Sequence, residues 1–284
     1  MRIHLILMLC YLETTICGYE YIYGKICDIQ SEDVSRQCFV KEVLLTLSHS
    51  PNQLAVDKNT NTLYFSFDSG QGEYVPGVFK IDTKKLTVLK GIKDAFSIAS
   101  HPTIEEIYFG GSHGIYKYNT VLKNLKRLDV TNLDIWWLVI KKKLYFIKFP
   151  SLNAYYYENR TVRPIPQLRN NSVNQFLFDE VDNIFFINGS GLYGLNNNSY
   201  NAKLLRDHPR FLGMAIDNQG LVHLCSEDGI YVISKIVQKV KRILSVQGVL
   251  GLTFDKDNNL IYSDSHEIIR LVPASREKPN KIEY

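Results

Sequence analysis

Short apolar segments alternate with turn residues along most of the chain, and equivalent segments are almost evenly spaced. One position of the pattern recurs about every 38 residues, at Phe79, Tyr116, Tyr155, Tyr193, Tyr231 and Ile269. The preceding apolar segment recurs with it, as TLYFSF (62–67), EIYFGG (106–111), KLYFIK (143–148), NIFFIN (183–188), LVHLCS (221–226) and LIYSDS (260–265). An earlier segment ends at Asp57, His101, Lys141, Asp179, Asp217 and Asp255. The chain therefore contains six copies of one unit.

Each copy has the pattern of a small antiparallel sheet. Three segments per copy are strand-like, and Asn, Asp and Gly fill the turns between them, as hairpins require. Five copies add a weaker fourth segment, namely LTVL (86–89), LKRL (125–128), VRPIP (162–166), AKLL (202–205) and VKRIL (240–244). Four short strands per radial repeat are typical of a propeller, whose repeats bury their faces by stacking on their neighbours. We predict an all-β fold, a six-bladed β-propeller, with residues 19–284 as a single domain.

The sixth copy lacks a fourth strand, because the C-terminal REKPNKIEY is polar and interrupted by proline. The segment CFVKEVLLTL (38–47) near the other end is strand-like but belongs to no copy. We therefore expect residues 38–47 to supply the outer strand of the sixth blade. The ring would then be closed by the two ends of the chain.

The first 18 residues, MRIHLILMLCYLETTICG, have the form of a secretory signal peptide: a basic residue, a short apolar run, then polar and small residues. We therefore expect an exported, extracellular protein. Of the cysteines beyond this leader, Cys27 and Cys38 lie close together in the sequence and are expected to form a disulfide. Cys225 lies in an apolar strand and is expected to be a buried free thiol.

Four N-x-[ST] sequons agree with export. They place candidate glycosylation sites at Asn159, Asn170, Asn188 and Asn197. The net charge of +4 is spread along the chain, which argues against nucleic acid as a partner. No segment after the leader is long and apolar enough to cross a membrane. We expect a monomer that binds neither nucleic acid nor membrane.

Propellers usually bind ligands on one face, near the axis. Counting back five residues from the end of each innermost strand gives Asn52, Phe96, Trp136, Asn174, Leu212 and Leu250. Counting back four gives Gln53, Ser97, Trp137, Gln175, Gly213 and Gly251. From these columns and the neighbouring loops, the candidate ligand-binding residues are Trp136, Phe96, Asn52, Asn174, Trp137, Phe211, His113, Asp264 and His266. Because adjacent residues of a strand face opposite ways, we expect Trp136 to face the axis. We expect Trp137 to lie between blades or at the rim of the pocket, chiefly as a packing residue.

An enzyme is one alternative, because the units are similar to those of NHL and gluconolactonase-like propellers and lack WD and kelch signatures. The resemblance to gluconolactonases would put metal ligands at Asn52, Asn174 and Asp264. One carboxylate and two amides make a poor site for a divalent cation, which prefers charged oxygen ligands. No hydrolase, phosphate-loop or dinucleotide motif is present either. We therefore expect neither catalysis, nor a metal, nor a cofactor.

Several segments resemble the ommochrome-binding proteins of moth and butterfly haemolymph. They are QLAVDKNTNTLYFSFDSG (53–70), YFGGSHGIYKYN (108–119), DIWWL (134–138) and KLYFIKFP (143–150). The resemblance implies a secreted haemolymph carrier of xanthommatin-type pigments, with no cofactor and no reaction. A planar pigment could stack on Trp136 or Phe96, and His113, His266 or Arg210 could bind its carboxylate. An extracellular propeller that binds another protein is the remaining alternative.

Overall fold

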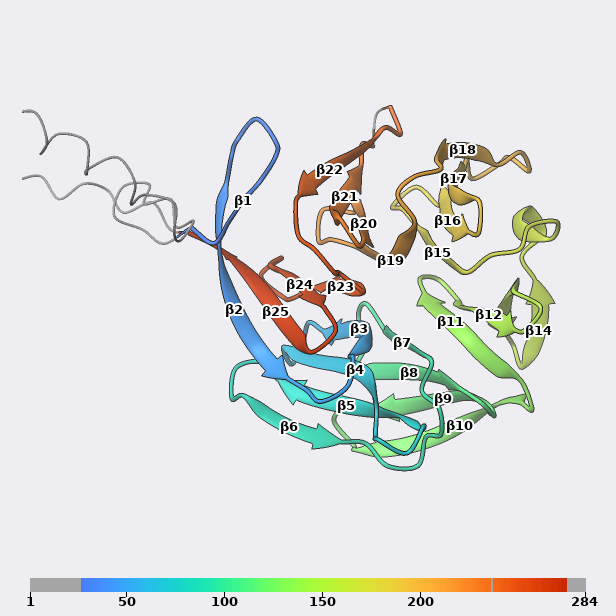
Figure 1. Ribbon diagram of the computed structural model, residues 1–284. Coiled ribbons are helices and arrows are strands. Elements are labelled where there is room, and N and C mark those ends of the chain that lie inside the picture. The colour runs from blue at the N-terminus through green and yellow to red at the C-terminus, as the bar shows by residue number, and fades with distance from the viewer. Residues whose placement is uncertain (1–26, 236, 275–284) are drawn as a thin grey trace, which may run out of the picture.

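The computed structural model describes residues 27–235 and 237–274, and these form six antiparallel sheets around a central axis (Figure 1). The predicted six-bladed β-propeller is confirmed. The proposed signal peptide, residues 1–18, lies outside the described residues. Among the described residues, no helix is both long and apolar enough to cross a lipid bilayer.

The first three blades follow one another along the chain. Blade 1 consists of β3 (Asn52–Asp57), β4 (Thr62–Asp68), β5 (Tyr74–Lys80) and β6 (Lys85–Val88). Blade 2 consists of β7 (Ser97–Ser100), β8 (Glu106–Gly111), β9 (Gly114–Asn119) and β10 (Asn124–Thr131). Blade 3 consists of β11 (Asp134–Ile140), β12 (Leu144–Phe149), β13 (Asn153–Glu158) and β14 (Thr161–Pro164).

A short 3₁₀ helix, Pro166–Leu168, leads into the second half of the ring. Blade 4 consists of β15 (Gln175–Phe178), β16 (Ile184–Asn188), β17 (Gly191–Leu195) and β18 (Lys203–Arg206). Blade 5 consists of β19 (Phe211–Ile216), β20 (Val222–Ser226), β21 (Gly229–Ile233) and β22 (Val240–Leu244). Blade 6 consists of β23 (Gly251–Phe254), β24 (Leu260–Ser263) and β25 (Glu267–Pro273), followed outward by β2 (Cys38–Thr46) and β1 (Ile29–Gln30).

The hydrophobic core lies between neighbouring blades. Apolar side chains from both faces of each sheet form separate clusters around the ring, rather than one central core. Aromatic rings make several of these contacts, as where Tyr64 of blade 1 meets Phe109 of blade 2 edge-on at 6.2 Å. Because each blade is covered on both faces only by its neighbours, the ring has to close for the first and last blades to be buried.

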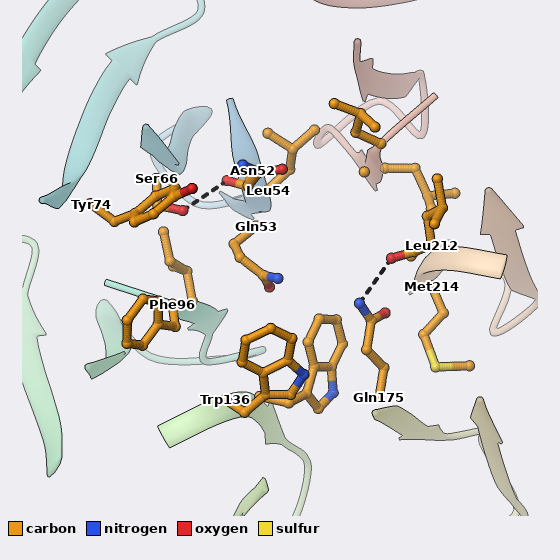
Figure 2. Close-up of a pocket in the computed structure, with 16 residues that line it drawn as sticks. Asn52, Gln53, Leu54, Ser66, Tyr74, Phe96, Trp136, Gln175, Leu212 and Met214 are labelled. Atoms are coloured by element: carbon orange, nitrogen blue, oxygen red, sulfur yellow. Dashed lines mark hydrogen bonds between the residues drawn. The ribbon is translucent and has the colours of Figure 1, made fainter. Parts of the chain in front are cut away.

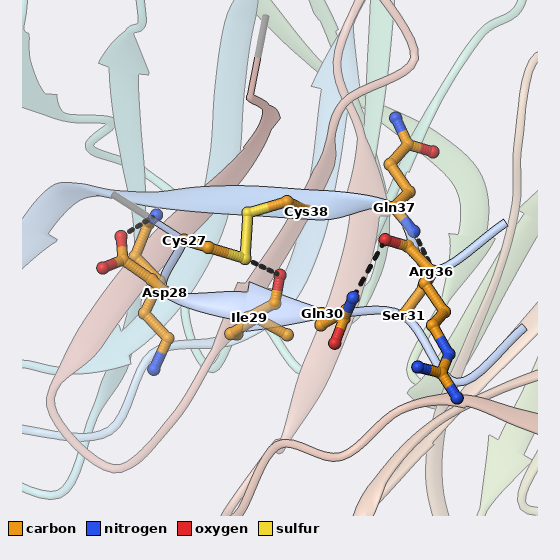
Figure 3. Close-up of a disulfide and its surroundings, with 9 residues drawn as sticks. Cys27, Asp28, Ile29, Gln30, Ser31, Arg36, Gln37 and Cys38 are labelled. Atoms are coloured by element: carbon orange, nitrogen blue, oxygen red, sulfur yellow. Dashed lines mark hydrogen bonds between the residues drawn. A yellow bond between two sulfur atoms is a disulfide. The ribbon is translucent and has the colours of Figure 1, made fainter. Parts of the chain in front are cut away.

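The ring closes through β2, as the unassigned apolar segment indicated. β2 pairs antiparallel with β25 from Phe39 opposite Pro273 to Thr46 opposite Glu267. The expected disulfide between Cys27 and Cys38 is present and ties β1 to the start of β2 (Figure 3). The loop of this hairpin lies beside β22 of blade 5, where the Glu32 N–H donates to the Ile243 carbonyl at 2.8 Å.

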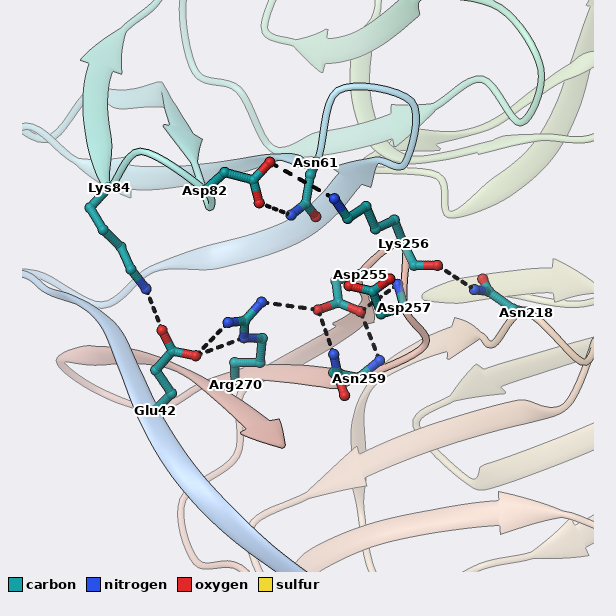
Figure 4. Close-up of polar contacts among 10 residues, drawn as sticks. All are labelled: Glu42, Asn61, Asp82, Lys84, Asn218, Asp255, Lys256, Asp257, Asn259 and Arg270. Carbon is teal, nitrogen blue, oxygen red and sulfur yellow. Dashed lines mark hydrogen bonds and ion pairs between the residues drawn. The ribbon is translucent and has the colours of Figure 1, made fainter. Parts of the chain in front are cut away.

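A chain of charged side chains fastens β2 to blades 1 and 6 (Figure 4). Arg270 donates to Glu42 from Nε at 2.9 Å and also contacts the fully buried Asp255 at 3.3 Å. Lys84 of the β5–β6 turn donates to the same Glu42 carboxylate. Burial alone would raise the pKa of Glu42, but the hydrogen bonds from Lys84 and Arg270 lower it. Glu42 is therefore ionised at neutral pH and links two blades through the closing strand.

Cys225 is the free thiol that the sequence indicated, and it is fully buried in β20. Burial raises the pKa of this thiol to about 12. Because the thiolate is the reactive form, protein beginning at residue 19 should not react with Ellman's reagent while it is folded. The same protein in concentrated guanidinium should release one equivalent. Rapid stoichiometric reaction of the folded protein would contradict this burial.

Candidate functional site

A cavity of about 360 Å³ lies on the axis of the ring, where the innermost strands begin (Figure 2). All six blades contribute to it. Its lining consists of Asn52, Gln53, Leu54, Ser66, Tyr74, Phe96, Ile98, Trp136, Trp137, Gln175, Leu212, Gly213, Met214, Leu250, Gly251 and Leu252. The volume falls within the range of about 300–1,000 Å³ that is typical of small-molecule sites.

The lining is divided by chemical type among the blades. Blades 2 and 3 supply an aromatic wall of Phe96, Trp136 and Trp137. Blades 5 and 6 supply an aliphatic wall in which glycines, such as Gly251, alternate with larger side chains. Amides come from blades 1 and 4, including Gln53, which extends toward the centre (Figure 2). The cavity can therefore hold a ring system on one side and hydrogen-bond its polar edges on others.

A β-bulge explains how both tryptophans reach the cavity. Ile135 pairs with Lys148 and Trp137 with Ile147, so that Trp136 is an extra residue with no partner across the ladder. A bulge interrupts the alternation of side chains along a strand. Regular alternation is therefore broken at this point of β11, and both tryptophans contribute to the lining.

The two tryptophans nevertheless differ in their surroundings. Trp137 packs among side chains of blades 4 and 5, and its Nε1 donates to the Phe176 carbonyl at 2.7 Å. Trp136 is 39% exposed and stacks on Phe149, with ring centroids 5.7 Å apart. Trp136 is therefore free to contact a ligand, whereas Trp137 is held in place as part of the wall.

Backbone groups help to position two amide side chains of the lining, Gln53 of blade 1 and Gln175 of blade 4. Gln53 has a φ of +54°, a conformation that costs a non-glycine residue about 1 kcal/mol or more. Gln175 donates from Nε2 to the Leu212 carbonyl at 2.9 Å, which bridges blades 4 and 5. Its Oε1 is buried and has no partner within the described residues. These two amides are among the neutral hydrogen-bonding groups of the site.

Of the nine candidate ligand-binding residues, Asn52, Phe96, Trp136 and Trp137 line the cavity, and the other five do not. Phe211 precedes a bulge in β19 and packs edge-on against Tyr231 at 5.4 Å, in the core between blades 4 and 5. Asn174 lies one residue before β15. The blade 4 residue that lines the cavity is its neighbour Gln175.

The remaining candidates lie in hairpin turns that do not reach the axis. His113 is in the tight turn between β8 and β9, and its carbonyl accepts from Arg127. The Asp264 carboxylate accepts the backbone N–H groups of His266 at 2.8 Å and Glu267 at 2.7 Å, so it organises its own turn. Short turns keep these side chains away from the cavity. The longer β4–β5 loop instead leads to Tyr74, which lines the cavity beside Phe96, with ring centroids 6.0 Å apart.

Half of the twelve cavity residues that sequence reasoning missed belong to the same two columns. Gln53, Gln175, Leu212 and Leu250 occupy positions equivalent to chosen residues. We chose candidates by the chemistry of their side chains, and this left out the aliphatic residues of the columns. Their position in the repeat was enough to predict that they line the cavity. The other half lie outside these columns. Four of them stand three residues before the end of an innermost strand, the next position of the same repeat, and they are Leu54, Ile98, Met214 and Leu252. The remaining two, Ser66 and Tyr74, belong to β4 and β5.

The lining has no ionisable group apart from the Tyr74 phenol: among these described residues there is no carboxylate, imidazole, ammonium or guanidinium. Of the three positions that the gluconolactonase resemblance would make metal ligands, only Asn52 belongs to the cavity. The residues expected to bind a ligand carboxylate, His113, His266 and Arg210, are likewise not part of the lining. The arrangement can stack and hydrogen-bond a ligand, but it does not bring together a charged site.

Known proteins share the fold of this chain much more widely than its sequence. No family model matches the chain. Among solved structures, a gluconolactonase from Xanthomonas campestris superposes with a TM-score of 0.67 over 87% of this chain and 96% of its own, at 13% identity. A luciferin-regenerating enzyme gives a TM-score of 0.67 over 84% and 96%, also at 13% identity. Likeness at this level of identity reflects the propeller fold alone.

One curated protein is similar in sequence over most of the chain. It is an ommochrome-binding protein of Manduca sexta, 29% identical over 251 residues, which cover 86% of this chain and 91% of that protein. The resemblance to ommochrome-binding proteins that the sequence indicated is thus confirmed.

Proposed function

We propose that the protein is a secreted carrier that binds an ommochrome of the xanthommatin type in the axial cavity and does not transform it. One observation carries the proposal: both tryptophans of the chain line a single cavity that contains amides and no charged group. The similarity to the Manduca sexta ommochrome-binding protein supports the choice of ligand.

The chemistry of such a pigment matches the walls of the cavity. Its planar, conjugated ring system would stack on Trp136, which exposes ring surface. Amide groups such as that of Gln53 would hydrogen-bond its ring oxygens and nitrogens. An ionised carboxylate buried without a partner is costly. The amino-acid arm of the pigment would therefore lie toward the mouth of the cavity, in contact with water.

The same lining argues for binding without turnover. Hydrolysis needs a general base within hydrogen-bond reach of the reacting water. The described residues that line the cavity offer amides, a serine hydroxyl, a phenol and indoles, but no carboxylate or imidazole. Pigment held there would be kept in solution and shielded.

Titration with xanthommatin tests this function directly. Protein beginning at residue 19 should show saturable, one-to-one quenching of tryptophan fluorescence and a shifted visible spectrum of the pigment. Both tryptophans line the cavity, so pigment bound there would lie next to the two fluorophores. Absence of quenching and of any spectral shift would contradict the carrier function. Hydrolysis of gluconolactone on addition of Ca²⁺ or Zn²⁺ would instead support the enzymatic alternative.

The four sequons lie in blades 3 and 4 and differ in how free their side chains are. Asn159 and Asn170 are exposed in turns. Asn188 is half-buried, and its Oδ1 accepts the Ser190 N–H at 2.8 Å. Asn197 donates from Nδ2 to the Val181 carbonyl at 3.2 Å. A glycan on Nδ2 would compete with that last hydrogen bond.

Secretion from insect cells should therefore give higher glycan occupancy at Asn159 and Asn170 than at Asn188 and Asn197. Peptide mass spectrometry before and after enzymatic deglycosylation measures the occupancy. Asn159→Gln, which removes one exposed sequon, should lower the mass by a single glycan. Full occupancy at Asn197 with none at Asn159 would be the opposite of this expectation.

A further inference from the structure

A second cavity, of about 370 Å³, lies between blades 1 and 2, toward their outer strands. Its lining consists of Thr60, Thr62, Tyr64, Val78, Lys80, Lys85, Thr87, Val88, Leu89, Tyr118, Thr120 and Lys123. We call it the blade 1–2 pocket. It shares no residue with the axial cavity, and its volume is again typical of small-molecule sites.

The strand register of blade 1 sets a charged row of side chains beside a less polar one. Lys80 of β5 is paired with Thr62 of β4 on one side and with Lys85 of β6 on the other. Residues that are directly paired, or two positions further along, share one face of a sheet. The adjacent row on this face therefore consists of Tyr64, Val78 and Thr87. All six side chains of the two rows line the pocket.

The cations of this pocket have no carboxylate partner. Lys80 and Lys85 carry like charges directly opposite each other on neighbouring strands, an arrangement that destabilises a sheet. Neither ammonium pairs with a carboxylate within the described residues, whereas the adjacent Lys84 pairs with Glu42 (Figure 4). Lys123 of the β9–β10 turn brings a third ammonium from blade 2, and the lining contains no Asp or Glu. The described lining is therefore positively charged throughout.

A buried phenol with an unused hydroxyl belongs to the same lining. Tyr64 is 2% exposed, and its ring packs edge-on against Phe109 between the two blades. Its hydroxyl makes no hydrogen bond within the described residues, yet it is not sealed from solvent as the unpartnered polar atoms of the interior are. Burial, with a smaller contribution from the Asp57 carboxylate, raises the pKa of this phenol. The hydroxyl therefore keeps its proton and can donate to a ligand in the pocket.

The carboxylate of Asp57 lies outside the lining and is held by its own turn. Asp57 is 2% exposed, and its Oδ1 accepts the Asn59 N–H at 3.1 Å. Its Oδ2 accepts the Thr60 hydroxyl at 2.7 Å. Neither oxygen pairs with a lysine of the pocket within the described residues, so this acid does not neutralise the three ammonium groups.

We propose that the blade 1–2 pocket is a second ligand site, which binds a small organic anion with an aromatic or other apolar body. Its anionic oxygens would accept charge-assisted hydrogen bonds from Lys80, Lys85 and Lys123 and offset the repulsion between the paired lysines. The Tyr64 hydroxyl would donate to the same anion, and the apolar body would pack on Val78. This assignment does not depend on what the axial cavity binds.

Calorimetric titration of matched probes into protein beginning at residue 19, at neutral pH and low salt, tests the proposal. We expect phenyl phosphate to bind about tenfold or more tightly than neutral benzyl alcohol, and the binding to weaken as salt screens the ammonium groups. Inorganic phosphate, which has no apolar body, should bind about tenfold more weakly than phenyl phosphate. Phenyl phosphate that fails to bind, or binds no more tightly than the alcohol or inorganic phosphate, would overturn the proposal.

Two variants locate the site. Tyr64→Phe removes only the hydroxyl and keeps the ring against Phe109, so the fold should be unaffected. Lys85→Gln removes one of the two opposed charges at an exposed position. Each should weaken phenyl phosphate binding about fivefold. Lys241→Gln is the matched control, because it changes the net charge equally at an exposed lysine of β22, outside the pocket, and it should leave the affinity unchanged.

Trp136→Ala, in the axial cavity, should likewise bind phenyl phosphate as the parent protein does. Loss of binding in that variant would place the anion on the axis and overturn the assignment. If folded Tyr64→Phe and Lys85→Gln proteins both keep the parent affinity, the blade 1–2 pocket is not the site. Equal weakening by Lys85→Gln and Lys241→Gln would show that only net charge matters, which also contradicts the proposal.

Discussion

Protein that begins at Ser48, and therefore lacks β2, is expected not to fold cooperatively. Among the described strands, β2 alone covers the outer edge of β25, and it is paired with β25 from Phe39 to Thr46. Without it, blade 6 would expose a strand edge whose side chains Ile268, Ile269 and Leu271 are buried in the intact ring. Exposed apolar edges of this kind promote aggregation.

The energies involved support a large effect. Burial of Leu44, which is 6% exposed, contributes about 1.5–3 kcal/mol. Hydrogen bonds to a charged group such as Glu42 contribute about 1.5–3 kcal/mol each, and less where the group is partly exposed. Ladder hydrogen bonds along β2 add about 0.5–1.5 kcal/mol apiece. Losses of this size approach the whole stability of a domain, about 5–15 kcal/mol.

Thermal unfolding followed by circular dichroism measures the effect. The matched control begins at Phe39, so that it loses β1 and the disulfide but keeps β2. The disulfide joins cysteines 11 positions apart, and a loop of that size is worth about 3 kcal/mol. This control should therefore melt cooperatively at a lower temperature. An unchanged melting temperature in the protein that begins at Ser48 would rule out ring closure by β2.

Trp136→Ala is expected to weaken xanthommatin binding at least tenfold, which corresponds to about 1.4 kcal/mol. Trp136 presents exposed ring surface to the cavity, while Phe149 supports it by stacking. Removing the indole takes away the stacking surface and leaves the rest of the fold intact, because its backbone lies in a bulge with no ladder partner. Trp136→Phe, which keeps a ring, should lose less.

Two further variants separate ligand contact from structural damage. Trp137→Phe removes the indole N–H bonded to the Phe176 carbonyl and should lower the melting temperature, which Trp136→Ala should not. Tyr200→Ala alters an aromatic residue that is 69% exposed and lies outside the cavity, so neither stability nor affinity should change. Affinity is measured by absorbance of bound pigment, because both tryptophans contribute to fluorescence. Full retention of affinity by a folded Trp136→Ala protein would remove Trp136 from the site.

Much of the architecture could be read from the sequence because a propeller repeats one local pattern. The period of about 38 residues gave the number of blades, and a strand-like segment without a repeat, residues 38–47, indicated how the ring closes. Cys27 and Cys38 could be paired because they lie close together on either side of a polar loop. These features depend on neighbouring residues, or on counting repeats, and need no knowledge of distant contacts.

The site was predicted less completely than the fold. A residue lines the cavity only if its side chain points toward the axis, and its position in the repeat does not determine that direction. The residues four and five positions before the end of each innermost strand predicted where the cavity lies. Four of the candidates, Asn52, Phe96, Trp136 and Trp137, do line it. Turn residues such as His113 and Asp264 were placed there on chemical grounds, although their short turns hold them away from it. The contact between the N-terminal hairpin loop and blade 5 was not foreseen, since Glu32 meets Ile243 only after the ring has closed.

The sequence by itself determined the strands, the sixfold repeat, the closing segment and the disulfide, because alternation, turn chemistry and spacing are local properties. Only the tertiary structure decided which side chains face the axis. The bulge at Trp136 exists because Ile135 pairs with Lys148 and Trp137 with Ile147, a register that depends on both strands of the hairpin. A single unpaired residue changes the direction of the side chains beside it. For this reason both tryptophans line one cavity, although alternation along a regular strand would have separated them.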